Sequence, residues 1–145
     1  MSNQSLSQNL QKIANYWVPP ILWCLVIFLF SSHPTGRTST IDWQDFAVKK
    51  LAHIAEYGIL ASLLYRAFRK TNFNRARSAF YSLLITVGYG MSDEIHQMFT
   101  PGREPRARDV IFDTIGALLA VTILWKILPK APKKLLSWAE KLGVA

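Results

Sequence analysis

The sequence predicts an all-α fold: an integral membrane bundle of four transmembrane helices, N-in/C-in, followed by a short amphipathic C-terminal tail. Three observations predict it. Half of the 145 residues are hydrophobic and only 18% are charged. Apolar stretches of helical length are separated by short segments rich in helix breakers. The formal charge is +8, and an excess of Lys and Arg is typical of the segments that flank membrane helices on one side.

Nucleic acid is the other ordinary partner of a basic protein. No basic stripe interleaved with aromatic residues and no nucleic-acid motif is present, so we expect no nucleic-acid partner. A chain of this length forms one domain. The single cysteine, Cys24, lies in an apolar run and leaves no internal disulfide possible.

The first helix is expected over residues 16–30, which carry no charge. Pro19 and Pro20 fit its first turn, where a missing N–H costs nothing. Residues 1–14 are polar, and we expect them to be loose or interfacial. No small-x-small cleavage site follows the apolar run, which therefore indicates an uncleaved signal anchor.

Three more helices are expected over residues 46–68, 76–99 and 109–128. A helix needs about 20 residues to cross roughly 30 Å of hydrocarbon. The second helix can span only if His53 and Glu56 lie inside the membrane. A soluble four-helix bundle is the alternative, because its core helices show similarly short apolar runs. The small residues expected to be packing contacts between helices are Gly88, Gly90, Gly116 and Ala120.

Loop charge sets the orientation of membrane helices. Eleven Lys and Arg lie on the side of the two termini, against six on the opposite side. Both termini are therefore expected in the cytoplasm. The basic tail, 129–145, places Leu135, Trp138 and Leu142 on one stripe, as in an interfacial helix.

This topology brings polar residues together at one outward-facing end of the bundle. The second helix begins there, the third ends there and the fourth begins there. Within each helix, spacings of three or four residues place the polar side chains on one face. The residues expected to form one polar pocket are Lys50, His53, Glu56, Asp93, Glu94, Gln97, Asp109 and Asp113.

Two chemistries are open at this cluster. Carboxylates held close together in a low dielectric cannot all be ionised, so some would keep a proton, as general acids require. The candidate acid/base residues are His53, Glu56, Asp93, Glu94 and Asp109. The same five could ligate a divalent cation, and their oxygen-rich set suits Mg, Mn or Ca better than structural zinc.

Structural roles are equally open. His53 and Glu56 could hydrogen-bond each other, since buried polar groups must be satisfied in lipid. Arg103 could pair with Asp109 and hold the loop 100–108 over the pocket. The remaining residues are expected to be peripheral: Arg106 and Arg108 as surface charges, His96 beside the polar face, Ser92 without a nucleophile elbow, and Pro101–Gly102 as a tight turn.

Taken in order, these residues resemble the VanZ-like family of small bacterial membrane proteins. One stretch, KLAHIAEYGIL, contributes Lys50, His53, Glu56, Tyr57 and Leu60. The other contributes Ser92, Asp93, Glu94, Gln97, Phe99, Pro101, Gly102, Arg103, Asp109, Asp113 and Gly116. The resemblance extends over residues 15–128, and the family often has Asn at the position of Asp113.

The resemblance implies a four-helix domain in the bacterial cytoplasmic membrane that acts at the cell envelope, in a family named for low-level teicoplanin resistance. The expected partners are membrane lipids and a lipid-linked envelope precursor or a glycopeptide. The candidate binding residues are Lys50, Tyr57, Gln97, Arg103 and Asp113, with the Arg103 fork suited to a phosphate or carboxylate. Two alternatives stay open: a scaffold in which the cluster is a structural latch, and a small proton-coupled carrier.

Overall fold

The computed structural model describes residues 3–34, 36, 40–103 and 106–143, without the side chains of residues 3–10 and 12. Arg37 and Glu104, two of the expected loop charges, lie outside these ranges. Within them the protein has five α-helices and no strand. The helices are α1 (Asn3–Ser31), α2 (Asp42–Lys70), α3 (Arg75–Gln97), α4 (Ala107–Thr122) and α5 (Lys133–Leu142). The predicted all-α class is confirmed.

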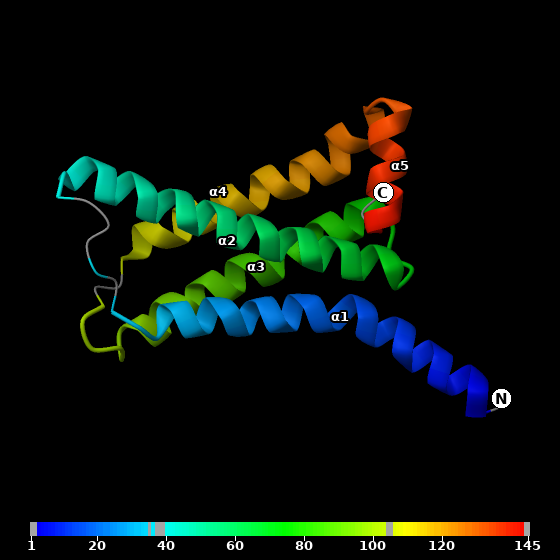
Figure 1. The fold of residues 1–145 in the computed structure, drawn as a ribbon, viewed down its shortest axis with the longest axis horizontal. Coiled ribbons are helices and arrows are strands. Elements are labelled where there is room, and N and C mark those ends of the chain that lie inside the picture. The colour runs from blue at the N-terminus through cyan, green and yellow to red at the C-terminus, as the bar shows by residue number, and fades with distance from the viewer. Residues whose placement is uncertain (1–2, 35, 37–39, 104–105, 144–145) are drawn as a thin grey trace.

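The first helix is longer than the sequence predicted. It begins at Asn3, so the polar segment expected to be loose is helical. Pro19 and Pro20 lie inside the helix and not in its first turn. A proline inside a helix removes one backbone hydrogen bond and clashes with the carbonyl four residues earlier, which bends the helix. Figure 1 shows this bend between the N-terminal part of α1 and the rest.

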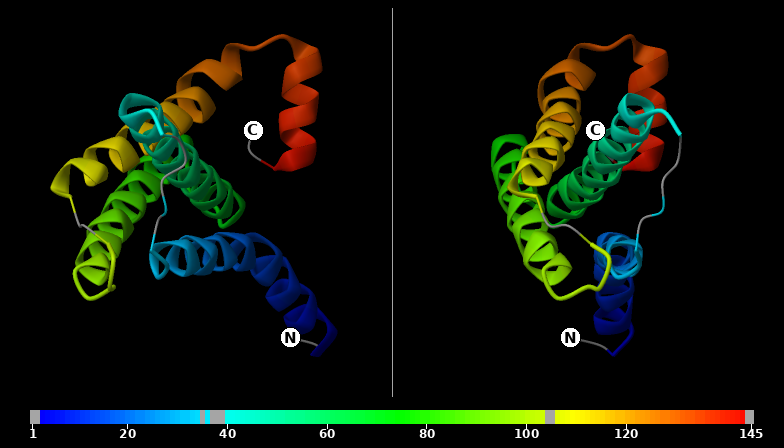
Figure 2. Two further views of the ribbon diagram at one scale, coloured as in Figure 1. Left: turned by 60° about the vertical axis from the view of Figure 1, so that its left-hand side comes forward. Right: turned by 90° about the vertical axis from the view of Figure 1, so that its left-hand side faces the viewer.

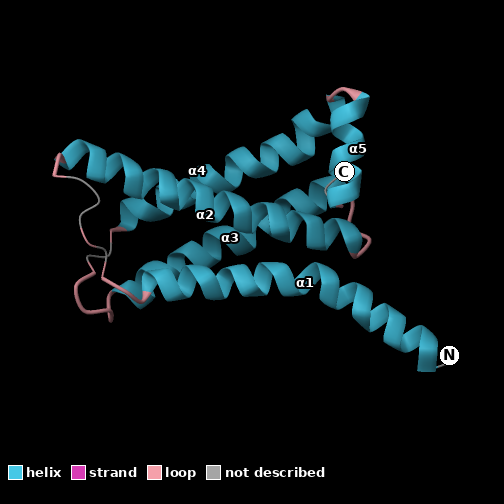
Figure 3. Ribbon diagram, in the orientation of Figure 1, coloured by secondary structure: helices cyan, strands magenta, loops and turns pink. Residues whose placement is uncertain are grey.

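The first four helices run alternately in opposite directions (Figure 1). The end of α1, the start of α2, the end of α3 and the start of α4 lie together at one end, which we call the pocket end. The N-terminus, the α2–α3 connection and α5 lie at the other, which we call the basic end. Figure 3 shows loops at both ends, and α2 contacts α1, α3 and α4. After α4 the chain continues through a π-helical turn (Ile123–Ile127) and a 3-10 turn (Leu128–Lys130) to α5, which lies at a sharp angle to α4 (Figure 2).

Glycine sets how closely the helices approach. A Cβ on Gly116 would lie 2.2 Å from the main-chain oxygen of Ile54, so α4 passes directly against the backbone of α2. A Cβ on Gly90 would lie 3.1 Å from the Asp113 carboxylate. Among the described residues nothing lies within 4 Å of a Cβ on Gly88, so the prediction of a packing contact there is wrong.

On α3 the distribution of side chains is inverted relative to a water-soluble bundle. The buried face of α3 carries Ser78, Ser82 and Thr86, while Phe80 and Leu84 are exposed. Two described segments are long and apolar enough to cross a membrane, residues 13–31 in α1 and 107–130 from α4 onward. A surface of this kind fits apolar surroundings, because lipid removes the need to bury apolar side chains.

Candidate functional site

A buried ion pair joins α2 to α4 at the pocket end. Lys50 Nζ lies 2.5 Å from Asp109 Oδ1, and both side chains are about nine-tenths buried. The ammonium group also lies 5.6 Å from the ring centres of Phe46 and Phe112. Asp109 is in the first turn of α4, where the helix N-terminus favours a carboxylate. The pair therefore fixes the start of α4 against α2.

A second contact between the same helices lies one turn deeper. His53 Nδ1 is 2.8 Å from Asp113 Oδ1, and His53 Nε2 is 3.9 Å from Asp109 Oδ2. The ring of Tyr57 stacks parallel to the imidazole at 6.4 Å. Gly90 leaves the space in α3 that the Asp113 carboxylate occupies. The partner of His53 is thus on α4, and the predicted hydrogen bond to Glu56 is not the one formed.

The end of α3 supplies two carboxylates with different partners. The Gln97 side-chain amide donates to Asp93 Oδ2 at 2.9 Å, one turn apart on the same helix. Glu94 Oε2 accepts from the main-chain N–H of Arg106 at 2.8 Å, which fastens the residue that precedes α4. The other oxygen, Glu94 Oε1, is buried and has no hydrogen-bond partner in the described part of the chain.

A tight turn at Pro101–Gly102 delivers Arg103 to the end of α1. The main-chain N–H of Arg103 donates to the carbonyl of Thr100 at 3.1 Å, and Gly102 has φ +79°. This is the pattern of a type II turn, which requires positive φ at its third residue. The Arg103 guanidinium donates to the carbonyls of His33, at 2.7 Å, and Phe30. It therefore holds the loop to α1, whereas Asp109 pairs with Lys50.

The end of α1 is a wall of the site that the sequence analysis missed. Trp23 Nε1 donates to the main-chain oxygen of Glu56 at 2.9 Å, and the Tyr89 hydroxyl donates to that of Cys24 at 2.6 Å. The Ser32 hydroxyl lies 3.0 Å from His96 Nε2. In two of these hydrogen bonds the acceptor is a main-chain oxygen, which every residue has, so no residue type in the sequence marks the position. The alternating direction of the helices could have predicted this wall, because it also places the end of α1 at the pocket end.

These elements enclose a cavity of about 700 Å³. Its apolar lining includes Ile27 and Phe30 of α1, and its polar lining comes from Ser31 at the end of α1, from α2, α3 and α4, and from the loops. The predicted site residues that line it are Lys50, His53, Glu56, Asp93, Gln97, Arg103 and Asp109. Three predicted residues, Tyr57, Glu94 and Asp113, are buried outside this lining. The polar residues not predicted for it are Ser31, His33, Asp45, Lys49 and Arg106.

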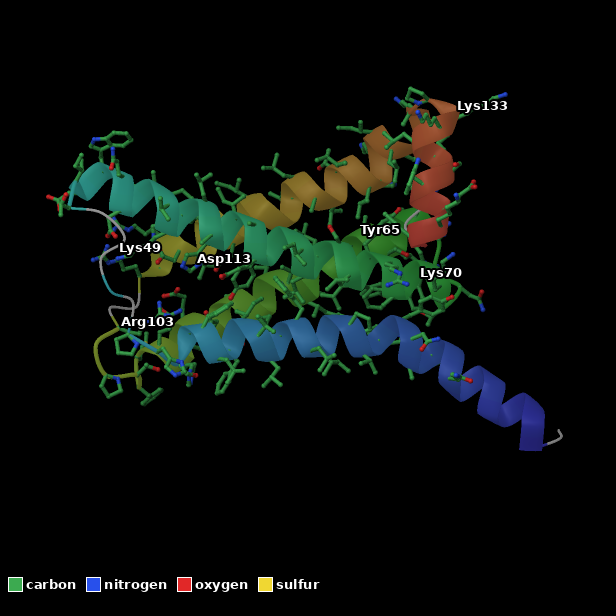
Figure 4. All side chains as sticks on the ribbon, viewed as in Figure 1. Lys49, Tyr65, Lys70, Arg103, Asp113 and Lys133 are labelled. Carbon is green, nitrogen blue, oxygen red and sulfur yellow. The ribbon has the colours of Figure 1, made fainter. Side chains whose placement is uncertain are left out.

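Figure 4 shows this division along the bundle. Asp113 lies between the helices, while Lys49 and Arg103 lie toward the loops of the pocket end. The paired groups Lys50, His53 and Asp109 thus line the cavity, and Asp113 lies deeper, outside the lining.

Glu56 differs from the other acidic residues of the cavity. Within the described ranges no hydrogen bond or ion pair engages its carboxylate, although the side chain lines the cavity and is only partly buried. By contrast, Asp93, Asp109 and Asp45 are held by Gln97, Lys50 and Lys49 respectively. The carboxylate that the chain leaves open to an incoming group is therefore Glu56.

The cluster has the arrangement of a hydrogen-bonded network and not of a metal shell. Among the described residues no three His, Cys, Asp or Glu side chains are placed to hold a metal ion. Ser92 is exposed and donates to the carbonyl of Tyr89, so its hydroxyl does not lie in the cavity lining. Arg106 and Arg108 are exposed.

Comparison with known proteins decides the family. The VanZ/LLP1 family model matches residues 16–129, which include α1 from residue 16 onward, all of α2, α3 and α4, and every predicted site residue. The chain belongs to the VanZ/LLP1 family. Comparisons with the curated proteins and with the solved structures found no match. Family membership and the two apolar helical segments indicate a membrane protein.

Proposed function

We propose that this VanZ/LLP1 protein spans the bacterial cytoplasmic membrane four times, with its pocket end on the extracytoplasmic side. Support comes from the inverted side-chain distribution of α3 and from the two apolar segments of α1 and α4. The concentration of Lys and Arg at the opposite end supports the sidedness, because such residues favour the cytoplasmic side.

We propose further that the cavity binds the headgroup of an envelope lipid or a lipid-linked precursor. The observation that carries this proposal is the mixed lining of the cavity at the end of a lipid-facing bundle. Ile27 and Phe30 offer apolar surface, and charged residues of α2, α3, α4 and the α3–α4 loop face the same space. An amphiphile with a polar headgroup fits both, since binding sites combine apolar walls with a few placed polar groups.

The free carboxylate of Glu56 specifies the chemistry of that headgroup. The other acidic residues with described bonds already accept hydrogen bonds, whereas Glu56 has its acceptor capacity open. A headgroup that offers amino or hydroxyl donors would satisfy it, as the sugars and amino acids of a lipid-linked precursor do. By binding such a precursor at the membrane surface, the protein would alter its access to glycopeptides and so contribute to teicoplanin-type tolerance.

A cavity-filling variant tests the proposal. Ala52 lines the cavity, and its neighbour Leu51 is 64% exposed outside that lining. The full chain is purified from bacterial membranes, and its retained lipids are identified by mass spectrometry. We expect Ala52→Phe and Glu56→Gln to lower retained precursor at least about tenfold, while Leu51→Phe retains it. The same lipids at the same yield in all of these variants would contradict a ligand-binding cavity.

A non-enzymatic latch is the second candidate function, and the pairing of Lys50 with Asp109 and of His53 with Asp113 favours it. In a latch, loss of one partner lowers abundance, stability and phenotype together. In a binding site, Glu56→Gln changes the phenotype at unchanged abundance. A carrier is disfavoured, because the residues that line the cavity lie at one end of the bundle and transporters place their sites near the membrane midplane.

A further inference from the structure

The basic end of the bundle carries many positive charges and almost no carboxylates to neutralise them. Described residues 57–92 and 114–143 include ten Lys and Arg and a single carboxylate, Glu140. At the pocket end, in contrast, carboxylates and cations alternate and pair. Such a one-sided concentration of cations attracts an anionic partner.

Two side chains of this set, both on the last turns of α2, lie beside the end of α5. Gly143, which ends α5 with φ +75°, has no Cβ. A Cβ there would lie 3.2 Å from Arg66 Nε and 3.7 Å from Lys70 Nζ. Two cationic groups on successive turns of α2 therefore lie beside one point of the chain. Figure 4 shows Lys70 next to the end of α5.

The guanidinium groups are held in place and still have donors to spare. Arg66 lies over the ring of Tyr16, 5.4 Å from its centre, and Arg69 donates through Nη1 to the carbonyl of Phe73 at 2.9 Å. Nevertheless, Nε of Arg66 and Nε of Arg69 are buried without a hydrogen-bond partner in the described part of the chain. Buried donors nearly always have a partner, which an ordered water or a bound group from outside the chain supplies when the chain does not.

The adjacent helix adds an apolar surface. On α5, Leu135, Trp138 and Leu142 are 53%, 59% and 63% exposed. Lys141 Nζ lies 5.4 Å from the ring centre of Trp138. An apolar stripe flanked by lysines is the pattern of a helix that lies in the membrane interface and binds anionic lipid.

We propose that the basic end is a binding site for the phosphate of an anionic phospholipid. Arg66, Arg69 and Lys70 donate to the phosphate oxygens, and the apolar stripe of α5 lies at the boundary between headgroups and acyl chains. Arg suits this role because its planar fork matches two phosphate oxygens at once. This site is separate from the cavity and lies at the opposite end of the bundle.

The test compares lipids that differ only in headgroup. The purified full chain in a neutral detergent is melted, and its tryptophan fluorescence is followed, with added phosphatidylglycerol or with phosphatidylcholine of the same acyl chains. With phosphatidylglycerol at about a hundred times its dissociation constant, we expect Tm to rise by about 5–10 °C. We expect phosphatidylcholine to raise Tm by less than about 2 °C. Inorganic phosphate at the same concentration should not reproduce the rise, because it lacks the acyl chains.

Two double variants with equal charge loss locate the site. Arg66→Gln with Lys70→Gln should remove at least half of the phosphatidylglycerol shift. Arg75→Gln with Arg77→Gln, two exposed cations of the same end, should retain it. If the first double variant does not fold, Lys70→Gln alone replaces it, since Lys70 is exposed and its loss does not disturb the contact with Tyr16.

Three results would overturn the proposal. An equal Tm shift with both lipids would remove the headgroup preference. Equal losses in the two double variants would show diffuse attraction instead of a site. A full shift with inorganic phosphate alone would assign the cations to a free anion and not to a lipid.

Discussion

The two ends of this bundle use charge in opposite ways. At the pocket end, Lys50 is paired with Asp109 and His53 with Asp113, across the α2–α4 contact and within a protein interior. At the basic end, Arg66 and Arg69 keep buried donors that no described group accepts. The comparison indicates that charges at the pocket end act mainly inside the molecule, and charges at the basic end act on something outside it.

At the pocket end, a structural latch and a binding site can exist side by side. Removing a charge from water is costly, and the cost is recovered only where a well-placed partner remains. The paired groups meet that condition and therefore fix α2 against α4. Glu56 stands apart from them, with an unengaged carboxylate facing the cavity. The latch and the candidate binding site are thus neighbouring parts of one structure.

The largest effect is expected from Asp109→Asn, which leaves the Lys50 ammonium buried without its counter-charge. Breaking a buried ion pair from one side typically costs about 3–5 kcal/mol of stability. For a chain of this length, that corresponds to a fall in Tm on the order of 10 °C, measured by thermal unfolding in detergent.

The matched change at the basic end is Arg75→Gln. This side chain is exposed, so its loss should change stability by no more than about 0.5 kcal/mol.

The double variant Lys50→Met with Asp109→Leu should be more stable than the sum of its single changes predicts, by about 0.5–3 kcal/mol. Strictly additive losses would show that the two side chains do not depend on each other.

The next largest loss of stability is expected from adding a methyl group to Gly116, and Gly143 at the basic end serves for comparison. A methyl group on Gly116 would collide with the main-chain oxygen of Ile54, which cannot move without shifting α2. Gly116→Ala should therefore cost about 2–3 kcal/mol, despite the better helix propensity of alanine. At the basic end, Gly143→Ala meets the flexible side chains of Lys70 and Arg66 and the strain of φ +75°, which costs about 1–2 kcal/mol. Thermal unfolding of both variants measures the difference, and a larger loss in Gly143→Ala would contradict it.

Periodicity and the alternation of helix direction made the convergence of polar residues predictable. Helices that alternate in direction must bring the second, third and fourth of them together at one end, and the structure places Lys50, Asp93 and Asp109 around one cavity there. The turn at Pro101–Gly102 was also predictable, because few residue pairs satisfy its backbone angles.

The features that the sequence could not show depend on rotation about each helix axis. Gly88 and Gly90 lie about 200° apart around α3, so both cannot face the same neighbour, and only Gly90 does. The bond of His53 to Asp113 was missed for the same reason, since the sequence does not show which face of α4 is turned toward α2. The helical start of α1 at Asn3 was missed because polar residues carry no apolar stripe there.

A smaller effect is expected where the buried partner can be replaced by an isostere. In Asp113→Asn the amide oxygen still accepts from His53 Nδ1, which lies 2.8 Å away, so the cost should stay below about 1 kcal/mol. In Asp113→Leu the imidazole loses its acceptor, and the cost should rise to about 1–3 kcal/mol. Thermal unfolding of the two variants separates the contribution of the hydrogen bond to stability from that of the charge on Asp113. Equal losses would show that the charge on Asp113 is what stabilises the pocket end.

The smallest change in stability is expected for Glu56→Gln, and it is the change that separates a site from a latch. Because no described group bonds the Glu56 carboxylate, its conversion to an amide removes no partner and should alter stability by less than about 0.5 kcal/mol. Ligand retention should fall all the same, since the amide is a weaker acceptor for amino and hydroxyl donors. A melting curve of the variant beside that of Asp109→Asn makes the comparison directly. If Glu56→Gln loses as much stability as Asp109→Asn, Glu56 belongs to the paired groups; if it loses ligand alone, the carboxylate serves the group that enters the cavity.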